Sequence, residues 1–157
     1  MQKDHSNVII FPPLIPITSF LVGIGLDRVA PLTSSLSETA RSDLRTVGAT
    51  VFCIGIAGFL WMVATMKRAR TPIHNAKTPT ALVETGPFRL SRNPMYVFGT
   101  VWYVGLALFL VELWPVLLVP VLLTVLHYTV VIREEAYLSR KFGAAYERYR
   151  SRVPRWL

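Results

Sequence analysis

MYVFGTVWYVGLALFLVELWPVLLVPVLLTVLHYTVVI, residues 95–132, contains one charged residue, Glu112. A single helix of these 38 residues would be about 57 Å long at roughly 1.5 Å per residue, which far exceeds the roughly 30 Å of a hydrocarbon core. The sequence ELWP at 112–115 interrupts the run near its middle, because proline disfavours helix continuation and tryptophan favours the membrane interface. The run therefore predicts two membrane-spanning helices that form an antiparallel hairpin.

Two further uncharged runs lie nearer the N-terminus, at 8–26 and 47–66. The second is long enough to cross a bilayer, whereas Pro12, Pro13 and Pro16 predict a kinked or partly interfacial first helix. Together the runs predict an all-α integral membrane protein of one domain, residues 1–157, with a C-terminal amphipathic helix. Its four transmembrane helices are expected at about 8–28, 47–66, 95–111 and 115–132.

The distribution of charge supports this topology. Charged residues are only 17% of the chain, well below the roughly one quarter of a typical soluble domain. The net charge of +8 is concentrated in the segments 67–94 and 133–157, whereas 27–46 is balanced. The positive-inside rule then places both termini and the 67–94 loop in the cytoplasm, at the inner membrane if the protein is bacterial. The basic segments are expected to face anionic lipid headgroups, and no nucleic-acid partner is expected.

Cysteine and histidine give no metal site. Cys53 is the only cysteine and lies in an apolar run, which excludes an intrachain disulfide. His5, His74 and His127 lack metal-ligand spacing. His127 lies at membrane depth, where it is either a functional residue or the partner in an interhelical hydrogen bond.

A polar loop, ETGPFRLSRNPMY at 84–96, leads into the long apolar run. Gly86-Pro87 predicts a turn, and Asn93-Pro94 predicts a helix start with Asn93 as its N-cap. The free backbone amides of such a start can receive an anion, with a charge-assisted bond from Arg92 and an aromatic wall from Tyr96. The alternative is an ordinary basic loop before a capped helix.

A pair of carboxylates, Glu134 and Glu135, follows the other end of the run. Either both enter water, or one turns inward to contact a cofactor or to act as a base. The hairpin would bring this pair and the 84–96 loop to the same membrane face, which defines a candidate site. Apolar residues at helical spacing predict one amphipathic helix over 134–150.

Two segments carry a family resemblance. LVETGPFRLSRNPMY at 82–96 and EExxLxxxFGxxYxxYxxxVPR at 134–155 resemble the isoprenylcysteine carboxyl methyltransferase and phospholipid methyltransferase superfamily, over roughly 47–157. The family's Arg-His-Pro-x-Tyr motif appears as residues 92–96. The resemblance implies a membrane methyltransferase that uses S-adenosylmethionine and a lipophilic or lipid-like small-molecule acceptor at the cytoplasmic face. By position it implies cofactor contacts at Thr80, Leu82, Val83, Phe88, Asn93, Pro94, Met95, Tyr96 and Glu134. Arg92 is a further expected cofactor contact, because of the charge-assisted bond described above.

Two departures from the family pattern affect the expected chemistry. Asn93 stands where the motif has His, and an amide cannot titrate near neutral pH. Val130 occupies the position at which members acting on prenylated proteins carry an Arg for the substrate carboxylate, although Arg133 lies close by. We therefore expect prenylcysteine to be a poor acceptor. Arg133 is a nearby residue that could substitute for that Arg, and it is a predicted catalytic residue together with Glu135. Glu135 is the expected base, because the cofactor would engage Glu134.

Two other classes of function fit the same features. A nicotinamide-dependent membrane reductase has a similar arginine-containing loop and C-terminal bundle, although this chain is short for one. A non-catalytic membrane protein that keeps the fold is the third possibility.

Overall fold

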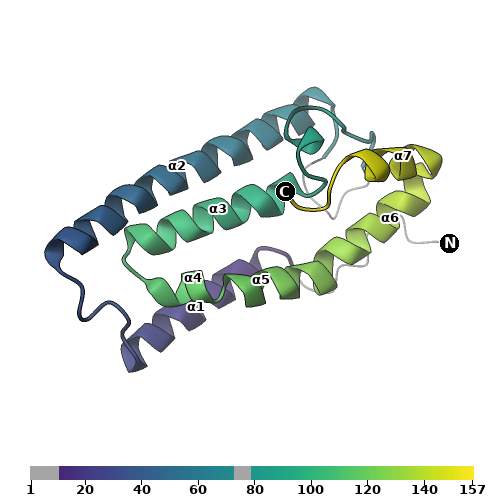
Figure 1. The fold of residues 1–157 in the computed structure, drawn as a ribbon. Coiled ribbons are helices and arrows are strands. Elements are labelled where there is room, and N and C mark those ends of the chain that lie inside the picture. Colours follow the sequence, from purple (N-terminus) through teal and green to yellow (C-terminus); the bar gives the residue numbers. More distant parts are fainter. Residues whose placement is uncertain (1–10, 73–78) are drawn as a thin grey trace.

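The computed structural model describes residues 11–72 and 79–157, and every regular element within these ranges is helical (Figure 1). This confirms the prediction of an all-α chain. The elements are α1 (Leu14–Val29), α2 (Glu38–Arg68), the 3-10 turn η1 (Gly86–Arg89), α3 (Pro94–Phe109), α4 (Leu113–Leu117), α5 (Val119–Leu126), the π-helical turn η2 (His127–Val131), α6 (Ile132–Phe142) and α7 (Ala144–Arg152).

Helix α2 has 31 residues and begins earlier than the expected 47–66 span. Ser37 caps it by accepting a 3.2 Å hydrogen bond from the Ala40 amide, and Lys67 and Arg68 complement the helix dipole in the last turn. Within the described residues, α2 alone is long and apolar enough to cross a membrane by itself; α3 is apolar but has 16 residues.

Glycines let α2 and α3 pack with their backbones almost in contact. A Cβ at Gly55 of α2 would overlap the backbone of Trp102, and a Cβ at Gly105 of α3 would overlap the backbone of Phe52. The Phe52 and Trp102 rings meet edge to face at 6.2 Å, which fills the space beside the two glycines. A Cβ at Gly58 of α2 would likewise overlap the Phe98 ring, so the close packing reaches from the second half of α3 into its first half.

The predicted hairpin turn is present, with a different role for its proline. Helix α3 ends at Phe109, and Val111 reverses the chain with a positive φ of 62° before α4 begins. Pro115 lies inside the first turn of α4, where it packs against Gly23 of α1, so it does not break a helix. Helix α1 is also tied to α3, because Ser19 Oγ lies 3.1 Å from the Tyr103 hydroxyl.

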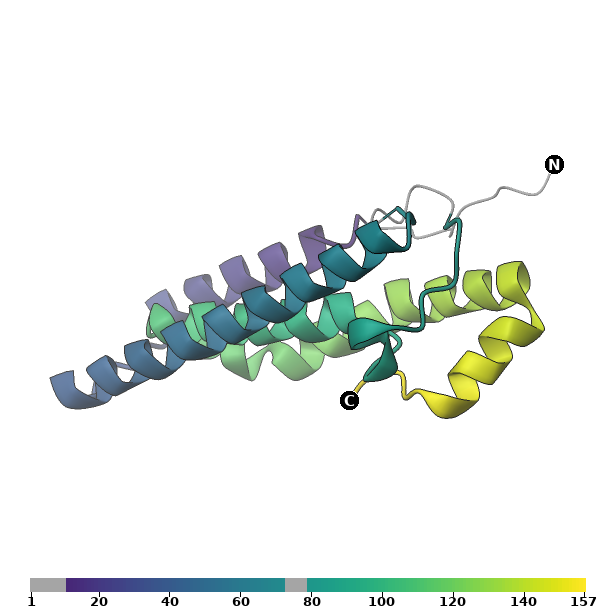
Figure 2. The same cartoon turned by 90° about the horizontal axis from the view of Figure 1, so that it is seen from above.

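The chain from α4 to α6 follows one line, with an interruption at Leu118 (Figures 1 and 2). Pro120 explains the interruption, because it lacks an amide and its ring crowds the carbonyl four residues earlier. The π-helical turn η2 joins α5 directly to α6. The Glu134-Glu135 pair therefore lies in the first turn of α6, within a continuing helical line, and does not mark the end of a membrane helix.

The single tail helix expected over 134–150 is wrong. Helix α6 ends at Phe142, and Gly143 adopts φ 51°, a conformation that side chains rarely tolerate. Helix α7 then turns back toward the loop before α3 (Figure 2). Residues 8–10 of the expected first helix lie outside the described residues, and α1 starts after Pro12-Pro13 without being kinked by them.

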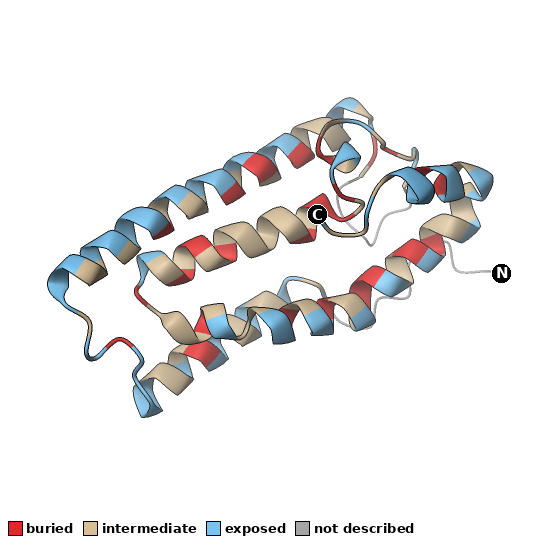
Figure 3. Ribbon diagram, viewed as in Figure 1, coloured by how far each residue is buried: buried red, intermediate tan, exposed pale blue. Residues whose placement is uncertain are grey.

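Large apolar residues are exposed on several helices, and Figure 3 shows exposed positions along these helices. Leu21 of α1 is 62% exposed, Leu60 of α2 is 59% exposed and Val121 of α5 is 58% exposed. Apolar faces of this extent are typical of a surface that meets lipid or a partner.

The glycine contacts generate a stability prediction. We expect Gly55→Ala and Gly105→Ala each to destabilise the protein by about 1–3 kcal/mol, because the added methyl group forces two packed backbones apart. The matched control is Gly25→Ala in α1, where nothing lies within 4 Å of an added Cβ. Unfolding of the purified protein in mild detergent measures the differences. Equal stability of all three variants would contradict the described α2–α3 packing.

Candidate active site

A cavity of about 150 Å³ lies where the end of α2, the loop before α3, and helices α6 and α7 meet. This is one end of the helical bundle, at the right in Figure 1. The predicted loop and the predicted carboxylate pair thus face one cavity. Of the residues predicted for the site, those that line it are Leu82, Val83, Phe88, Arg92, Asn93, Pro94, Met95, Tyr96, Glu134 and Glu135.

Two predicted site residues lie elsewhere. Thr80 is exposed and holds the loop together, since its hydroxyl donates to the Arg70 carbonyl at 2.9 Å and its amide to Thr71 Oγ1 at 3.2 Å. Arg133 is half-buried and does not line the cavity. The structure therefore does not support Thr80 as a cofactor contact or Arg133 as a catalytic residue.

Glu134 is the titratable group of the cavity. The Tyr96 hydroxyl donates a 3.0 Å hydrogen bond to its Oε1. Burial raises the pKa of Glu134 from an ordinary 4.5 to about 7, although the bond from Tyr96 acts in the opposite direction. A carboxyl group with this pKa exchanges a proton close to neutral pH, as a general base must.

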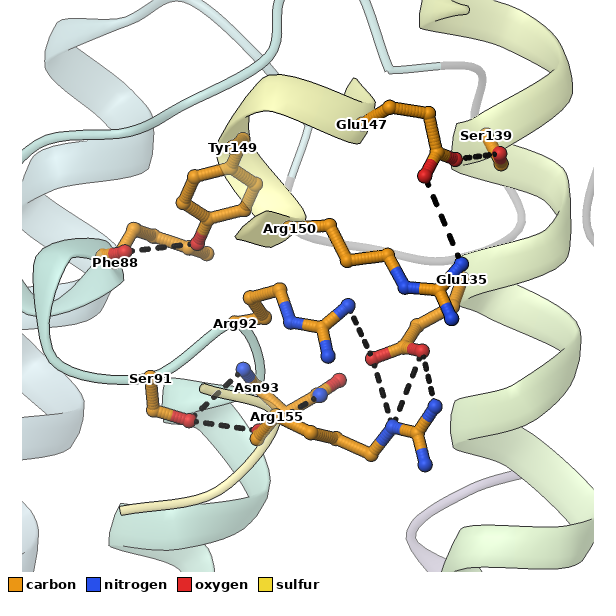
Figure 4. A network of polar contacts seen from close by, with 10 residues as sticks. All are labelled: Phe88, Ser91, Arg92, Asn93, Glu135, Ser139, Glu147, Tyr149, Arg150 and Arg155. Atoms are coloured by element: carbon orange, nitrogen blue, oxygen red, sulfur yellow. Dashed lines mark hydrogen bonds and ion pairs between the residues drawn. The ribbon is translucent and has the colours of Figure 1, made fainter. Parts of the chain in front are cut away.

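Glu135 has a different environment, because two guanidinium groups hold it (Figure 4). Arg155 binds it through Nη2 at 2.8 Å and Nε at 3.1 Å, and Arg92 Nη1 lies 3.2 Å from its Oε1. These bonds raise the pKa of Arg155 above its ordinary value. Both carboxylate oxygens of Glu135 are thus engaged by guanidinium groups. Its expected role as the base stays a prediction, and the buried Glu134 is a second candidate.

The cluster of Arg92, Glu135 and Arg155 carries two positive charges and one negative charge. The side chains of Arg92 and Glu135 are only 8% and 10% exposed. Both line the cavity together with Glu134, whereas Arg155 does not, so the wall holds one buried guanidinium group beside two carboxyl groups.

Asn93 occupies the N-cap position of α3, but its side chain does not cap the helix. Its Nδ2 donates instead to the Arg155 carbonyl at 3.0 Å. The Asn93 carbonyl accepts the Tyr96 amide at 3.1 Å, so that amide is not available to an anion. Of the expected features of this helix start, Pro94 at the first position is confirmed and the side-chain cap is wrong.

Aromatic residues of α7 complete the cavity wall. Tyr146 and Tyr149 are buried, and the Tyr149 hydroxyl donates to the Phe88 carbonyl at 2.8 Å. Burial raises the pKa of both hydroxyls, which remain protonated at neutral pH. The sequence analysis assigned no role in the site to these tyrosines or to Met62 of α2. Both tyrosines belong to the C-terminal motif at 134–155, and their place in it could have indicated that they line the site.

A second cavity, of about 450 Å³ and almost entirely apolar, lies between α1, α2, α3 and α5. Phe20, Phe59 and Leu122 contribute to its walls. Met95 and Tyr96 line both cavities. The first turn of α3 therefore separates the cavity that contains Arg92, Glu134 and Glu135, which we call the polar cavity, from the apolar cavity.

Two residues deeper in the bundle do not extend the site. Val130 is fully buried in the apolar core, so no cation stands there for a substrate carboxylate. His127 Nδ1 is buried without a hydrogen-bond partner among the described residues, so the interhelical bond, one of the two roles expected for His127, is not made through that atom. His74 lies outside the described residues. Residues 11–72 and 79–157 hold no group of three or more side chains that could bind a metal ion.

Comparison with known proteins gives a family and one distant relative. The family model for phospholipid methyltransferase matches residues 44–145. The nickel-cobalt-cadmium resistance protein NccN of Alcaligenes xylosoxydans xylosoxydans is 29% identical over 145 residues, which cover 88% of this chain and 67% of NccN. No solved structure matches the chain.

Proposed function

Because the chain belongs to the phospholipid methyltransferase family, we propose that it is an integral membrane enzyme that transfers a methyl group from S-adenosylmethionine to a small lipophilic or lipid-like acceptor. The observation that carries this proposal is the pairing of the two cavities at Tyr96. One cavity is polar and holds Glu134, and the other is apolar and large enough for a hydrocarbon chain.

The residues of the polar cavity fit S-adenosylmethionine, which when bound supplies an activated methyl group on a positively charged sulfur. Glu134 in its charged form attracts a cation, and the faces of Phe88 and Tyr149 favour cations and flat rings. The guanidinium group of Arg92 can bind a carboxylate. The cavity of about 150 Å³ is smaller than the roughly 300–1,000 Å³ of typical ligand pockets, so it would enclose only part of the cofactor.

The apolar cavity is the proposed place for the tail of the acceptor. An acceptor held there would present its reactive head at Tyr96, next to the carboxyl group of Glu134. If the head carries a proton, Glu134 is the group that can remove it. The buried Val130 gives no anchor for a carboxylate, which supports an acceptor other than prenylcysteine.

The proposed topology has four crossings, made by α1, α2, α3 and the line from α4 to η2. The ends of α2 and α6 and the start of α3 then lie at the cytoplasmic face, with the basic segments 67–94 and 133–157. The exposed apolar side chains of α1, α2 and α5 support a lipid-facing surface. The name of NccN refers to metal resistance. The described ranges hold no group of three or more side chains that could bind a metal ion, so we do not include metal resistance in the proposal.

A methyl-transfer assay tests the activity. We expect purified protein with radiolabelled S-adenosylmethionine to label an acceptor in membrane lipid extract and to label a prenylcysteine analogue poorly. Glu134→Gln should lose most of the transfer, whereas Glu147→Gln, a change at an exposed carboxylate, should retain it. Efficient labelling of prenylcysteine would overturn the interpretation of Val130, and no labelling of any acceptor would count against the activity itself.

Calorimetry tests the cofactor site. Affinity for S-adenosylmethionine should fall as the pH drops below about 7, because protonated Glu134 no longer attracts the cation, and this pH dependence should vanish in Glu134→Gln. Tyr96→Phe should weaken binding by about 1 kcal/mol and move the midpoint to higher pH, because the lost hydrogen bond favours the charged carboxylate. An affinity independent of pH in the unaltered protein would refute the role of Glu134. Binding of NADPH instead would favour the reductase alternative.

Cysteine labelling tests the topology. In a Cys53→Ala background, Ser35→Cys lies in the exposed α1–α2 connection and Ser151→Cys lies on the exposed face of α7. A membrane-impermeant maleimide applied to intact cells should label position 35, and should label position 151 only after the cells are opened. Labelling of both positions in intact cells would contradict the proposed arrangement.

A further inference from the structure

The last five residues, 153–157, form a segment that we name the C-terminal strap. It continues from the end of α7 and passes along the loop before α3, where the chain ends (Figures 1 and 4). The Pro154 carbonyl accepts the Arg92 amide at 2.9 Å. The Arg155 carbonyl accepts two more bonds, from Ser91 Oγ and Asn93 Nδ2, each at 3.0 Å. Three consecutive loop residues are therefore fastened to two consecutive strap residues.

The side chain of Arg155 makes the second connection. Its guanidinium binds both oxygens of Glu135 on α6, at 2.8 and 3.1 Å. Arg155 thus joins the two walls of the polar cavity, with its main chain on the loop side and its side chain on the α6 side. Charge-assisted, two-pronged contacts of this kind fix orientation as well as distance.

The strap is anchored beyond Arg155 as well. Trp156 packs against the buried apolar cluster that contains Tyr96 and Val130, and its ring centre lies 6.3 Å from that of His127. At the other end, the Val153 amide donates to the Tyr149 carbonyl at 3.1 Å. The strap is therefore held on both sides of the contact that it makes with the loop.

No strap residue lines the polar cavity, whereas Arg92, Asn93 and Glu135, which the strap holds, all do. The strap also contacts Tyr149 through Val153 and the cluster of Tyr96 through Trp156. The cavity residues that Pro154 and Arg155 hold by hydrogen bonds are Arg92, Asn93 and Glu135. If the Arg155 guanidinium were removed, Glu135 would keep Arg92 as its sole cationic partner in this network. Arg92 would then be drawn closer to Glu135 and away from a ligand, and the loop would lose its link to α6.

We propose that Arg155 is a positioning residue of the cofactor site, which sets the placement of Arg92 and Asn93 through the strap. This inference rests on the proposed methyltransferase function for the identity of the ligand. The fastening of the loop, however, is a property of the protein without ligand. The two can therefore be tested separately.

The first measurement is hydrogen–deuterium exchange of the protein without cofactor. Arg155→Ala should speed exchange in the segment 91–97, because the loop is no longer tied to α6, and leave the α2–α3 packing region unchanged. Arg155→Lys, which keeps the charge but not the two-pronged contact, should give an intermediate increase. The control is Arg152→Ala, which removes an exposed ion pair between α7 and Glu84 and should leave 91–97 as in the unaltered protein.

The second measurement is the affinity for S-adenosylmethionine by calorimetry. Arg155→Ala should weaken it by about tenfold, as for the loss of one charge-assisted interaction, while the KM for the acceptor stays the same. Arg155→Lys should recover part of the loss, and Arg152→Ala should show none.

If Arg155→Ala fails to fold, Ser91→Ala tests the fastening from the loop side, because it removes the Ser91 bond to the Arg155 carbonyl. It also removes the bond that Ser91 Oγ accepts from the Asn93 amide, so exchange in this variant is read at 95–97. Its control is Ser151→Ala, whose hydroxyl bonds only within α7. Unchanged exchange in 91–97 for both loop-side and strap-side variants would overturn the proposal, as would a uniform increase across all helices. An unaltered protein that binds no S-adenosylmethionine would overturn the proposed function, and the exchange result alone would then decide whether the strap holds the loop.

Discussion

The carboxylate of Glu135, held between Arg92 and Arg155, is the contact on which the arrangement of the polar end depends. It joins three parts of the chain that are distant in sequence: the loop before α3, helix α6 and the C-terminus. Removing one partner of a buried ion pair typically costs about 3–5 kcal/mol, because the remaining charge is left without compensation. Arg92 and Glu135 also line the cavity, whereas Arg155 does not. The contacts that support this end of the protein therefore also place two of the charged groups of the cavity wall.

The packing of α2 against α3 explains why this cluster stays in place. Glycine contacts at Gly55 and Gly105 bring the two backbones together, which leaves little freedom for the first turn of α3. That turn carries Met95 and Tyr96, which separate the polar cavity from the apolar one. A water-soluble methyl donor and a lipid-soluble acceptor would therefore approach the same tyrosine from different phases.

The sequence predicted the juxtaposition of the loop and the carboxylate pair correctly, because the length of the 95–132 run allowed only a hairpin. It did not predict that two guanidinium groups hold Glu135 whereas Glu134 bonds to Tyr96. That difference depends on Arg155, which reaches Glu135 only through the turn at Gly143. The extra turns of α2 were missed because charged residues suggested a loop, whereas Ser37 caps a helix there. The single tail helix was predicted because the helical spacing of apolar residues continues past Gly143. The positive φ of Gly143 ends the helix there all the same.

The π-helical turn η2, between α5 and α6, determines which way the carboxylates face. A π-turn accommodates one more residue than an α-turn, and one residue corresponds to about 100° of rotation around a helix of 3.6 residues per turn. If the same residues were wound as an ordinary α-helix, everything after Val131 would be rotated by about this angle relative to α5. Glu134 and Glu135 would then leave the cavity together, although neither had been altered. A substitution within 127–131 that favours ordinary α-helical winding would thus remove the site from a helix whose two glutamates are intact.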